Sequence, residues 1–431
     1  MKLCLAKSEN ERTGRNAVDR EKDRTFAPAD VSETERKESY KEAVTNAEPT
    51  PPAAPEAGAP PKLLRVFHAA DFHLDSPFAG MDLKSSDARR RTLLSVFLSA
   101  LHRAAEDGCQ LILLSGDLFD SGYVTTDTLE AVKAGLKACP LPVVIAPGNH
   151  DPFVPGGVFS GDWPDNVTVF SSETLTYADF DALGVRVHGY AFTSDSYTAH
   201  PLSGGVALHP TYWNLLCAHA DLASPLSRYA PIAPAELAAS GFDYAALGHI
   251  HKSPAPQTLG KSLVAYAGFP MGRGFDELGN GSALEIALDR SKGSVALTRL
   301  VLSTQRYVIE ALDITGAARS GDAVEKLQRL ISEKGYGTET CLRVVLTGAV
   351  TPGFPAELSL GRETFGTALL EIRNDTVPLY DADALESDPT LKGAFYRELC
   401  EQLRSPDEYS RRVAAEALRI GLLALDGRSF T

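Results

Sequence analysis

The sequence has no long hydrophobic run. None of the apolar stretches among its 431 residues approaches the roughly 20 consecutive apolar residues that a membrane-spanning helix needs. The apolar stretch within residues 1–7 also ends too soon for a secretory signal peptide. We therefore expect a cytoplasmic protein that has no membrane partner.

Cysteine is scarce as well. The chain has six cysteines, they are scattered, and no two of them have Cys-x-x-Cys spacing. This distribution argues against a disulfide framework and against a zinc ribbon. We expect buried free thiols at Cys4, Cys109, Cys139, Cys217, Cys341 and Cys400.

Positive charge is in short supply too. Lysine and arginine number 42 against 56 aspartates and glutamates, which gives a formal net charge of -14. Such an excess of negative charge repels nucleic acid and counts against a protein that simply coats DNA. It does not count against a nuclease, because bound divalent cations and local basic patches can reverse the field at one site.

The composition divides the chain into four parts. Residues 1–62 mix charges of both signs with few large apolar residues and end in proline-rich sequence, which predicts a disordered tail. Residues 63–303 alternate buried-strand and helical patterns, which predicts a domain with a layered α/β core. A small α/β domain is expected over residues 304–385, and C-terminal helices over residues 386–431.

Hydrophobic periodicity predicts the individual elements. Strands are expected at residues 64–70, 111–114, 141–146, 214–218, 244–247 and 263–266, and a hairpin over 283–301 that turns at Ser291-Lys292-Gly293. Helices are expected at residues 87–107 and 125–138. Further along, the pattern predicts strands at 306–312 and 342–347, a helix at 322–334, and two amphipathic helices within 390–424.

Five of the predicted strands end in residue types that bind metals. The first runs into Asp71 and His73, and the second into Asp117 and Asp120. The third runs into 149–151, and the two later strands end at His219, His249 and His251. Because the carboxyl ends of strands in α/β layers gather at one edge, we expect these distant residues to converge.

The residue types define the chemistry of such a cluster. Imidazole nitrogens together with carboxylate oxygens select manganese, iron or zinc, whereas a pure magnesium site would use oxygen ligands and a structural zinc site thiolates. The candidate ligands suffice for two ions with one bridging carboxylate. Two such ions can clamp both oxygens of an in-line phosphoryl displacement.

The motifs, taken in order, resemble those of a known family. The ordered series resembles the calcineurin-like metallophosphoesterase signature: Asp71-x-His73, Gly116-Asp117-x-x-Asp120, Gly148-Asn149-His150-Asp151, His219 and Gly248-His249-x-His251. Within it, Gly-Asp-Leu-Phe-Asp and Gly-Asn-His-Asp resemble the DNA-repair exonuclease branch, which includes the SbcD nuclease subunit and YhaO-type proteins. The segment 68–78, and Arg273 with Glu277, resemble the YhaO type.

The resemblance implies a fold, partners and a metal. The fold is a four-layer β-sandwich flanked by helices, with a small α/β cap domain and C-terminal helices that meet an SMC-like ATPase. The implied substrate is DNA, the implied cofactor is two divalent metal ions, with Mn²⁺ as our prediction, and a homodimer is also implied.

The resemblance also implies a role for each site residue. One metal would be held by Asp71, His73 and His251, and the other by Asn149, His219 and His249, with Asp117 as the bridge. His150 would act near the leaving-group oxygen as an acid or as a charge stabiliser. Asp120 and Asp151 would orient the ligands and His150 from outside.

Two alternatives stay open. The same scaffold could hydrolyse a small nucleotide-like phosphoester, although the residues after 303 favour a larger substrate and a partner. The chain could also be a non-catalytic scaffold for an ATPase, but none of the expected metal ligands is missing. A protein phosphatase is disfavoured, since Ser121-Gly122 follows Asp120 and Asp151 stands where those enzymes have glutamate.

Overall fold

The computed structural model describes residues 60–78, 81–120, 122–222, 224–351, 354 and 365–427. The predicted tail, residues 1–62, therefore lies almost wholly outside the described residues. The chain separates into two compact units, and the described part of the smaller one is residues 381–397. The larger unit, residues 60–380 and 398–431, contains both main sheets and the candidate site.

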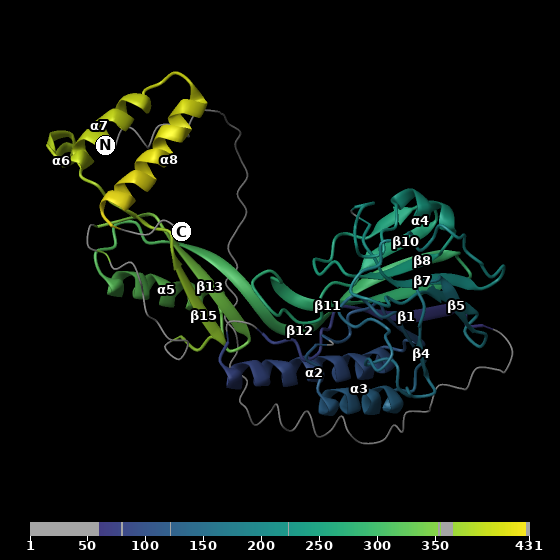
Figure 1. Cartoon of the computed structure of the whole chain (residues 1–431). Helices are drawn as coiled ribbons and strands as arrows, with labels where there is room; N and C mark the ends of the chain where they lie inside the picture. The colour runs from purple at the N-terminus through teal and green to yellow at the C-terminus, as the bar shows by residue number, and fades with distance from the viewer. Residues whose placement is uncertain are drawn as a thin grey trace, which may run out of the picture. The chain divides into compact units, whose positions relative to one another are not determined.

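Two sheets form the centre of the larger unit (Figure 1). The eight-stranded sheet has the order β15-β13-β12-β11-β1-β2-β3-β4, and the six-stranded sheet has the order β5-β6-β7-β8-β10-β9. The strands of the first are β1 (Leu63–Ala69), β2 (Leu111–Leu114), β3 (Val143–Ile145), β4 (Val167–Val169), β11 (Gly279–Asp289), β12 (Ser294–Asp313), β13 (Thr340–Thr347) and β15 (Leu369–Asn374). Those of the second are β5 (Thr176–Phe180), β6 (Val185–Gly189), β7 (Trp213–His219), β8 (Tyr244–Gly248), β9 (Gln257–Leu259) and β10 (Ser262–Tyr266).

The alternation of side chains along each strand makes the layers. In β1, Leu64 and Val66 belong to the core shared with the second sheet, whereas Phe67 and Ala69 belong to the core beneath the helices. Successive residues of a strand point to opposite faces, so a strand that is apolar at every position is buried on both sides. His68 packs in the inter-sheet layer, where Tyr244 Oη lies 2.7 Å from its Nδ1.

Helices complete the outer layers. α2 (Leu83–Glu106) and α3 (Thr126–Ala138) lie side by side on the first sheet, and α4 (Pro234–Ser240) lies by the second (Figure 1). Asp82 and Thr125 cap α2 and α3 by accepting hydrogen bonds from backbone N–H groups of the first turn. The predicted mixed α/β fold with two sheets and flanking helices is confirmed.

The strand β12 continues past the boundary expected at residue 303. Its first part pairs with β11, and residues 306–313 pair with β13, so the segment predicted as a separate strand extends the hairpin strand. α5 (Ser320–Lys334) packs on this extension through Leu327 and Ile331. The remaining elements are β14 (Ala349–Val350), β16 (Val377–Pro378), α6 (Ala382–Ser387), α7 (Leu391–Gln402) and α8 (Glu408–Leu425). No helix in the described part of the chain is long and apolar enough to cross a membrane.

Candidate metal centre

The predicted site residues converge at one edge of the two sheets. β1, β2 and β3 run parallel in the first sheet, and β7 and β8 run parallel in the second. Their carboxyl ends therefore lie together, and the polar loops that follow them meet. All predicted ligands and all three predicted catalytic residues lie in this cluster, although their individual roles stay predictions.

One half of the cluster joins the loop after β1 to the loop after β8. His73 Nε2 lies 3.2 Å from His251 Nε2. Asp71 Oδ1 lies 3.9 Å from His251 Nε2. The ligand atoms of these three residues all lie within 4.8 Å of one another, which is close enough for one cation.

The other half joins the loop after β3 to the end of β7. His219 Nε2 lies 3.0 Å from Asn149 Oδ1. The His249 ring packs edge-on against the His219 ring, with centroids 5.2 Å apart. His219 donates from Nδ1 to the Ser115 carbonyl oxygen over 3.1 Å, which leaves the Nε2 lone pair free to face the cluster.

Asp117 lies between the two halves. Its Oδ2 is 3.5 Å from His73 Nε2 and 3.3 Å from His219 Nε2. Its Oδ1 accepts a hydrogen bond from the backbone N–H of His150 at 2.9 Å. One carboxylate that faces both halves is the arrangement that a bridging ligand requires.

The cluster fits divalent metal ions by geometry. With metal–ligand bonds of roughly 2.1 Å and angles between octahedral and tetrahedral values, two ligand atoms on one ion lie about 3.0–3.4 Å apart. The His73–His251 and His219–Asn149 contacts, at 3.2 and 3.0 Å, fall in this range.

Protonation also suits cation binding. Burial lowers the pKa of His249 to about 4 and holds the pKa of His73 well below its usual value. Both imidazoles are therefore neutral near pH 7, and a neutral imidazole is the form that binds a metal.

His150 lies at the exposed rim of the cluster. Its side chain is 46% exposed, its ring packs edge-on against His73, and its Nδ1 lies 3.5 Å from Asp120 Oδ1. The hydrogen bond with Asp120 raises the pKa of His150, which favours the protonated ring. A partly exposed imidazolium beside the ligands can donate a proton to a leaving group.

Asp151 has no exposed surface and fastens two of the loops together. It accepts backbone N–H hydrogen bonds from Gly148 at 2.7 Å, Phe119 at 3.0 Å and Asp117 at 3.2 Å. Burial and the neighbouring Asp117 raise its pKa. The carboxylate thus positions the loops that carry Asp117 and Asn149.

Two glycines of the motifs are required by close approach. A Cβ at Gly148 would meet Asp117 Oδ1 and would lie 2.7 Å from its backbone nitrogen. A Cβ at Gly116, where φ is +91°, would meet the His219 ring. Since the ligands pass this close to the backbone, any side chain at these positions would displace them.

Two residues that lie against the cluster had been assigned no role. Glu277 Oε1 is 2.8 Å from His251 Nδ1 and 2.6 Å from Arg273 Nη2. Burial opposes its ionisation, but the hydrogen bond from His251 and the charge of Arg273 hold the pKa of Glu277 at about 2. In the sequence, Arg273 and Glu277 stand out only through their motif resemblance. That resemblance does not indicate that they contact His251.

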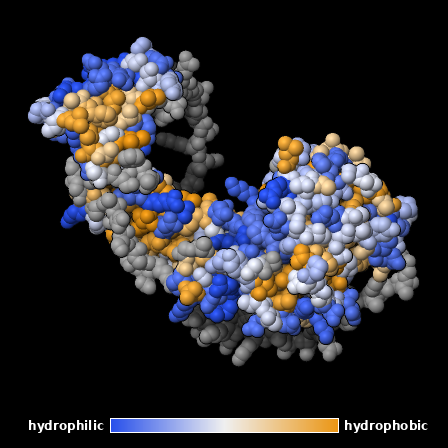
Figure 2. All heavy atoms as spheres, in the orientation of Figure 1, coloured by the Kyte–Doolittle hydropathy of each residue, from blue (hydrophilic) through white to orange (hydrophobic). Residues whose placement is uncertain are grey.

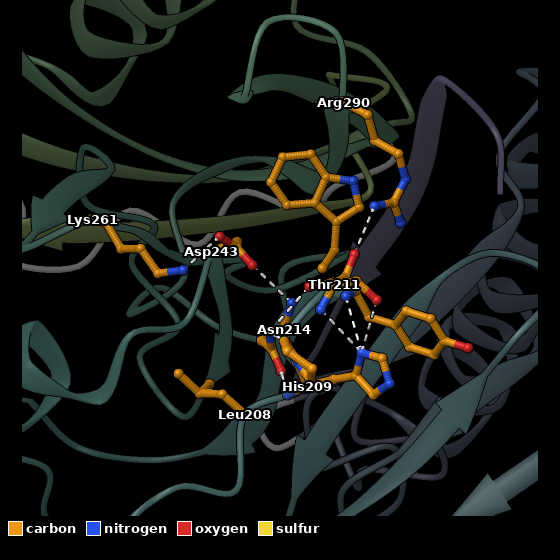
Figure 3. Close-up of a pocket in the computed structure, with 10 residues that line it drawn as sticks. Leu208, His209, Thr211, Asn214, Asp243, Lys261 and Arg290 are labelled. Carbon is orange, nitrogen blue, oxygen red and sulfur yellow. Dashed lines mark hydrogen bonds and ion pairs between the residues drawn. The ribbon is translucent and has the colours of Figure 1, made fainter.

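A separate pocket of about 370 Å³ opens at the other end of the second sheet, next to Trp213 at the start of β7. Figure 3 shows Asp243 between Lys261 and Asn214, and it accepts hydrogen bonds from the side chain of the first and the backbone of the second. Arg290 donates to the Thr211 carbonyl in the same wall. These contacts fix the loop before β7, and none of the described residues that line this pocket belongs to the metal cluster.

Comparisons with known proteins agree with the metal cluster. Residues 64–253 match the family model described as calcineurin-like phosphoesterase. The chain is 29% identical over 303 residues to "Uncharacterized metallophosphoesterase YhaO" of Bacillus subtilis (strain 168), which covers 66% of this chain and 72% of that protein.

Two similar solved structures are TT1561 of Thermus thermophilus and a dimetal phosphatase from Danio rerio. The first is 13% identical with a TM-score of 0.32, and it covers 55% of this chain and 98% of the other. The second is also 13% identical with a TM-score of 0.34, and it covers 56% of this chain and 99% of the other.

Proposed function

We propose that this calcineurin-like phosphoesterase domain is a two-metal phosphodiesterase that acts as a DNA exonuclease in DNA repair, uses Mn²⁺, and works with an SMC-like ATPase. The observation that carries the proposal is the arrangement of ligand atoms around Asp117. Its Oδ2 faces His73 Nε2 and His219 Nε2 at 3.5 and 3.3 Å, and each of these nitrogens has a further ligand atom beside it.

The residues present fit two ions in this cluster. Asp71, His73 and His251 would hold one, Asn149, His219 and His249 the other, and Asp117 would contact both. When bound, the ions would supply a nucleophile at neutral pH and neutralise charge on the phosphoryl oxygens. The protein's own contribution is to place these ligands and to hold the His150 proton next to the leaving-group oxygen.

The DNA substrate is proposed from the motifs and from the rest of the chain. Gly116–Asp120 and Gly148–Asp151 resemble the exonuclease branch, and residues 304–427 add α5, the β13 extension and the C-terminal helices. The partly exposed His150 fits a substrate that approaches from outside the domain. A pocket for one small nucleotide would not need these additional elements.

The ATPase contact is proposed for α8. Tyr409 and Val413, one helical turn apart, are 75% and 49% exposed. Figure 2 shows hydrophobic residues among hydrophilic ones over the C-terminal helices. An exposed apolar stripe on a helix is suited to packing against a partner. A homodimer is part of the same proposal and follows from the resemblance.

A nuclease assay tests the catalytic part. Linear single- and double-stranded DNA and bis-p-nitrophenyl phosphate are incubated with the full chain and Mn²⁺, with His150→Ala as the matched control. Release of mononucleotides by the wild type alone is expected. Cleavage of the small diester with DNA left intact would show that the substrate is a smaller phosphoester. Hydrolysis of neither substrate would refute the proposed phosphodiesterase activity.

The partner contact needs a separate test. Tyr409→Ser/Val413→Ser should weaken co-purification of an SMC-like ATPase co-expressed with the chain, while hydrolysis of the small diester stays unchanged. The control is Glu408→Gln, which alters the same helix without touching the apolar stripe. Equal co-purification of all three proteins would contradict the assignment of α8.

A further inference from the structure

The Glu277 carboxylate is buried where no substrate reaches it directly. Only 1% of the residue is exposed, and it precedes β11 in the loop that follows the Gly272-Arg273 pair. Its Oε1 accepts from His251 Nδ1 at 2.8 Å and from Arg273 Nη2 at 2.6 Å. The carboxylate oxygen is thus an acceptor that both nitrogens share, and the nitrogens themselves lie 3.3 Å apart.

The position of Glu277 determines which nitrogen of His251 faces the cluster. With the Nδ1 proton donated to Glu277, the lone pair of Nε2 points to His73 Nε2, 3.2 Å away. His219 shows the same pattern in the other half, where Nδ1 donates to the Ser115 carbonyl. The two imidazoles are thus oriented from behind by different acceptors, one charged and one neutral.

The loop that carries Glu277 is itself held in place. Arg273 donates to both oxygens of Glu277 through its side chain and its backbone N–H, the latter at 2.8 Å. Arg89 of α2, which is buried, donates to the Gly272 carbonyl at 3.0 Å and also hydrogen-bonds Gln305. A chain of contacts therefore runs from α2 through the 272–277 loop to His251.

We propose that Glu277 is a positioning residue for the metal ion held by Asp71, His73 and His251, acting through the Nδ1 hydrogen bond of His251, and that Arg273 keeps its carboxylate in place. The inference rests on the proposed two-metal function. It assigns to Glu277 an effect on one of the two metal positions, because the ligand that Glu277 contacts is His251, in the first half of the cluster.

Manganese titration of the metal-free full chain tests the proposal. We expect the wild type to bind two Mn²⁺ ions, and Glu277→Gln to bind one of them about 10–100-fold more weakly while the other keeps its affinity. Calorimetry resolves the two affinities without requiring catalysis. The control is Asp243→Asn, which removes an ion-paired carboxylate at the opposite end of β8 and should leave both affinities unchanged.

A double-mutant cycle separates positioning from general loss of stability. If Glu277 acts through His251, then Glu277→Gln should have no further effect on Mn²⁺ affinity in a His251→Ala background. If Glu277→Gln fails to fold, Glu277→Asp keeps the charge for Arg273 but withdraws the carboxylate from His251 and should show the same loss at one site.

The outcomes are distinguishable. A wild type that binds no Mn²⁺ refutes the proposed function itself. The role of Glu277 is overturned if folded Glu277→Gln binds both Mn²⁺ ions with wild-type affinity. It is also overturned if the losses of Mn²⁺ affinity add in the double variant. Either result leaves the two-metal site intact.

Discussion

Replacing Gly148 with alanine tests how closely the cluster is packed. The new Cβ would lie 2.7 Å from the Asp117 backbone nitrogen, whereas ordinary contacts begin at 3.4 Å, and it would also meet Asp117 Oδ1. The 148 loop and Asp117 must therefore separate by 0.7 Å, the difference between these two distances. Metal sites tolerate errors of about 0.2 Å in ligand distance, so the position of the bridging carboxylate would be lost.

The expected result is a folded protein with impaired metal binding. Overpacking of this kind costs about 2 kcal/mol, which lowers the Tm of a domain of this size by roughly 4–8 °C. Because Asp117 faces both halves, Gly148→Ala should weaken both Mn²⁺ sites and abolish hydrolysis of bis-p-nitrophenyl phosphate.

The matched control is Gly161→Ala. Its Cβ would meet only Lys133 Nζ at 3.6 Å, an ordinary contact, so stability, metal binding and hydrolysis should all stay at wild-type levels. Wild-type Mn²⁺ affinities in Gly148→Ala, measured by calorimetry on the metal-free proteins, would show that the cluster is looser than the structure indicates and refute the reasoning.

Metal binding, the buried Arg89 and the buried His68 can each be tested in the same way. Chelation of metals should abolish hydrolysis, lower the Tm and be reversed by Mn²⁺, because ligands that bind only the folded state stabilise it; an unchanged Tm and activity would count against the metal site. Arg89→Ala should destabilise the protein by about 2–4 kcal/mol in urea unfolding, because it removes a buried hydrogen bond to the Gly272 carbonyl, a partly buried one to Gln305, and the contacts with the Phe78 and Tyr307 rings. The control Arg91→Ala, at an exposed position of the same helix, should have little effect. Burial lowers the pKa of His68 to about 3, below the unfolded value of 6.5, so the unfolded state binds more protons between these values and stability should fall as pH is lowered from 6.5. This single group contributes a slope of up to about 1.4 kcal/mol per pH unit, and urea unfolding at pH 7 and 5 should show a smaller loss for His68→Gln; equal losses would contradict the assignment.

The sequence was informative where local pattern and topology coincide. Strands that end in Asp71, Asp117, Asn149, His219 and His249 could be located from their apolar runs, and parallel pairing was enough to bring their ends together. The helices predicted at residues 87–107 and 125–138 end close to where α2 and α3 end, because capping and turn residues act locally.

Contacts between distant segments could not be predicted in this way. The link from Glu277 to His251 depends on how the loop before β11 folds back, and no periodicity records it. The continuity of β12 past residue 303 could not be predicted for a similar reason. The first part of the strand pairs with β11 and residues 306–313 pair with β13, so the pattern of exposed residues changes along the strand.

Hydrogen bonds between the loops of the cluster offset the backbone strain there. Asp71, His73, Asp117 and His249 have φ values of 55°, 47°, 51° and 98°, in a region that costs residues other than glycine of order 1–3 kcal/mol each. The compensating contacts run between the same loops: Asp71 N–H donates to the Gly116 carbonyl at 3.0 Å, His73 N–H to the Asp117 carbonyl at 2.9 Å, and His249 N–H to the Asp71 carboxylate at 3.1 Å. The carboxylates that face the metal positions thus also bind the backbone of neighbouring ligand loops. The contacts that form on folding therefore hold the ligands at their spacing. A metal ion that binds there meets an arrangement that is already formed.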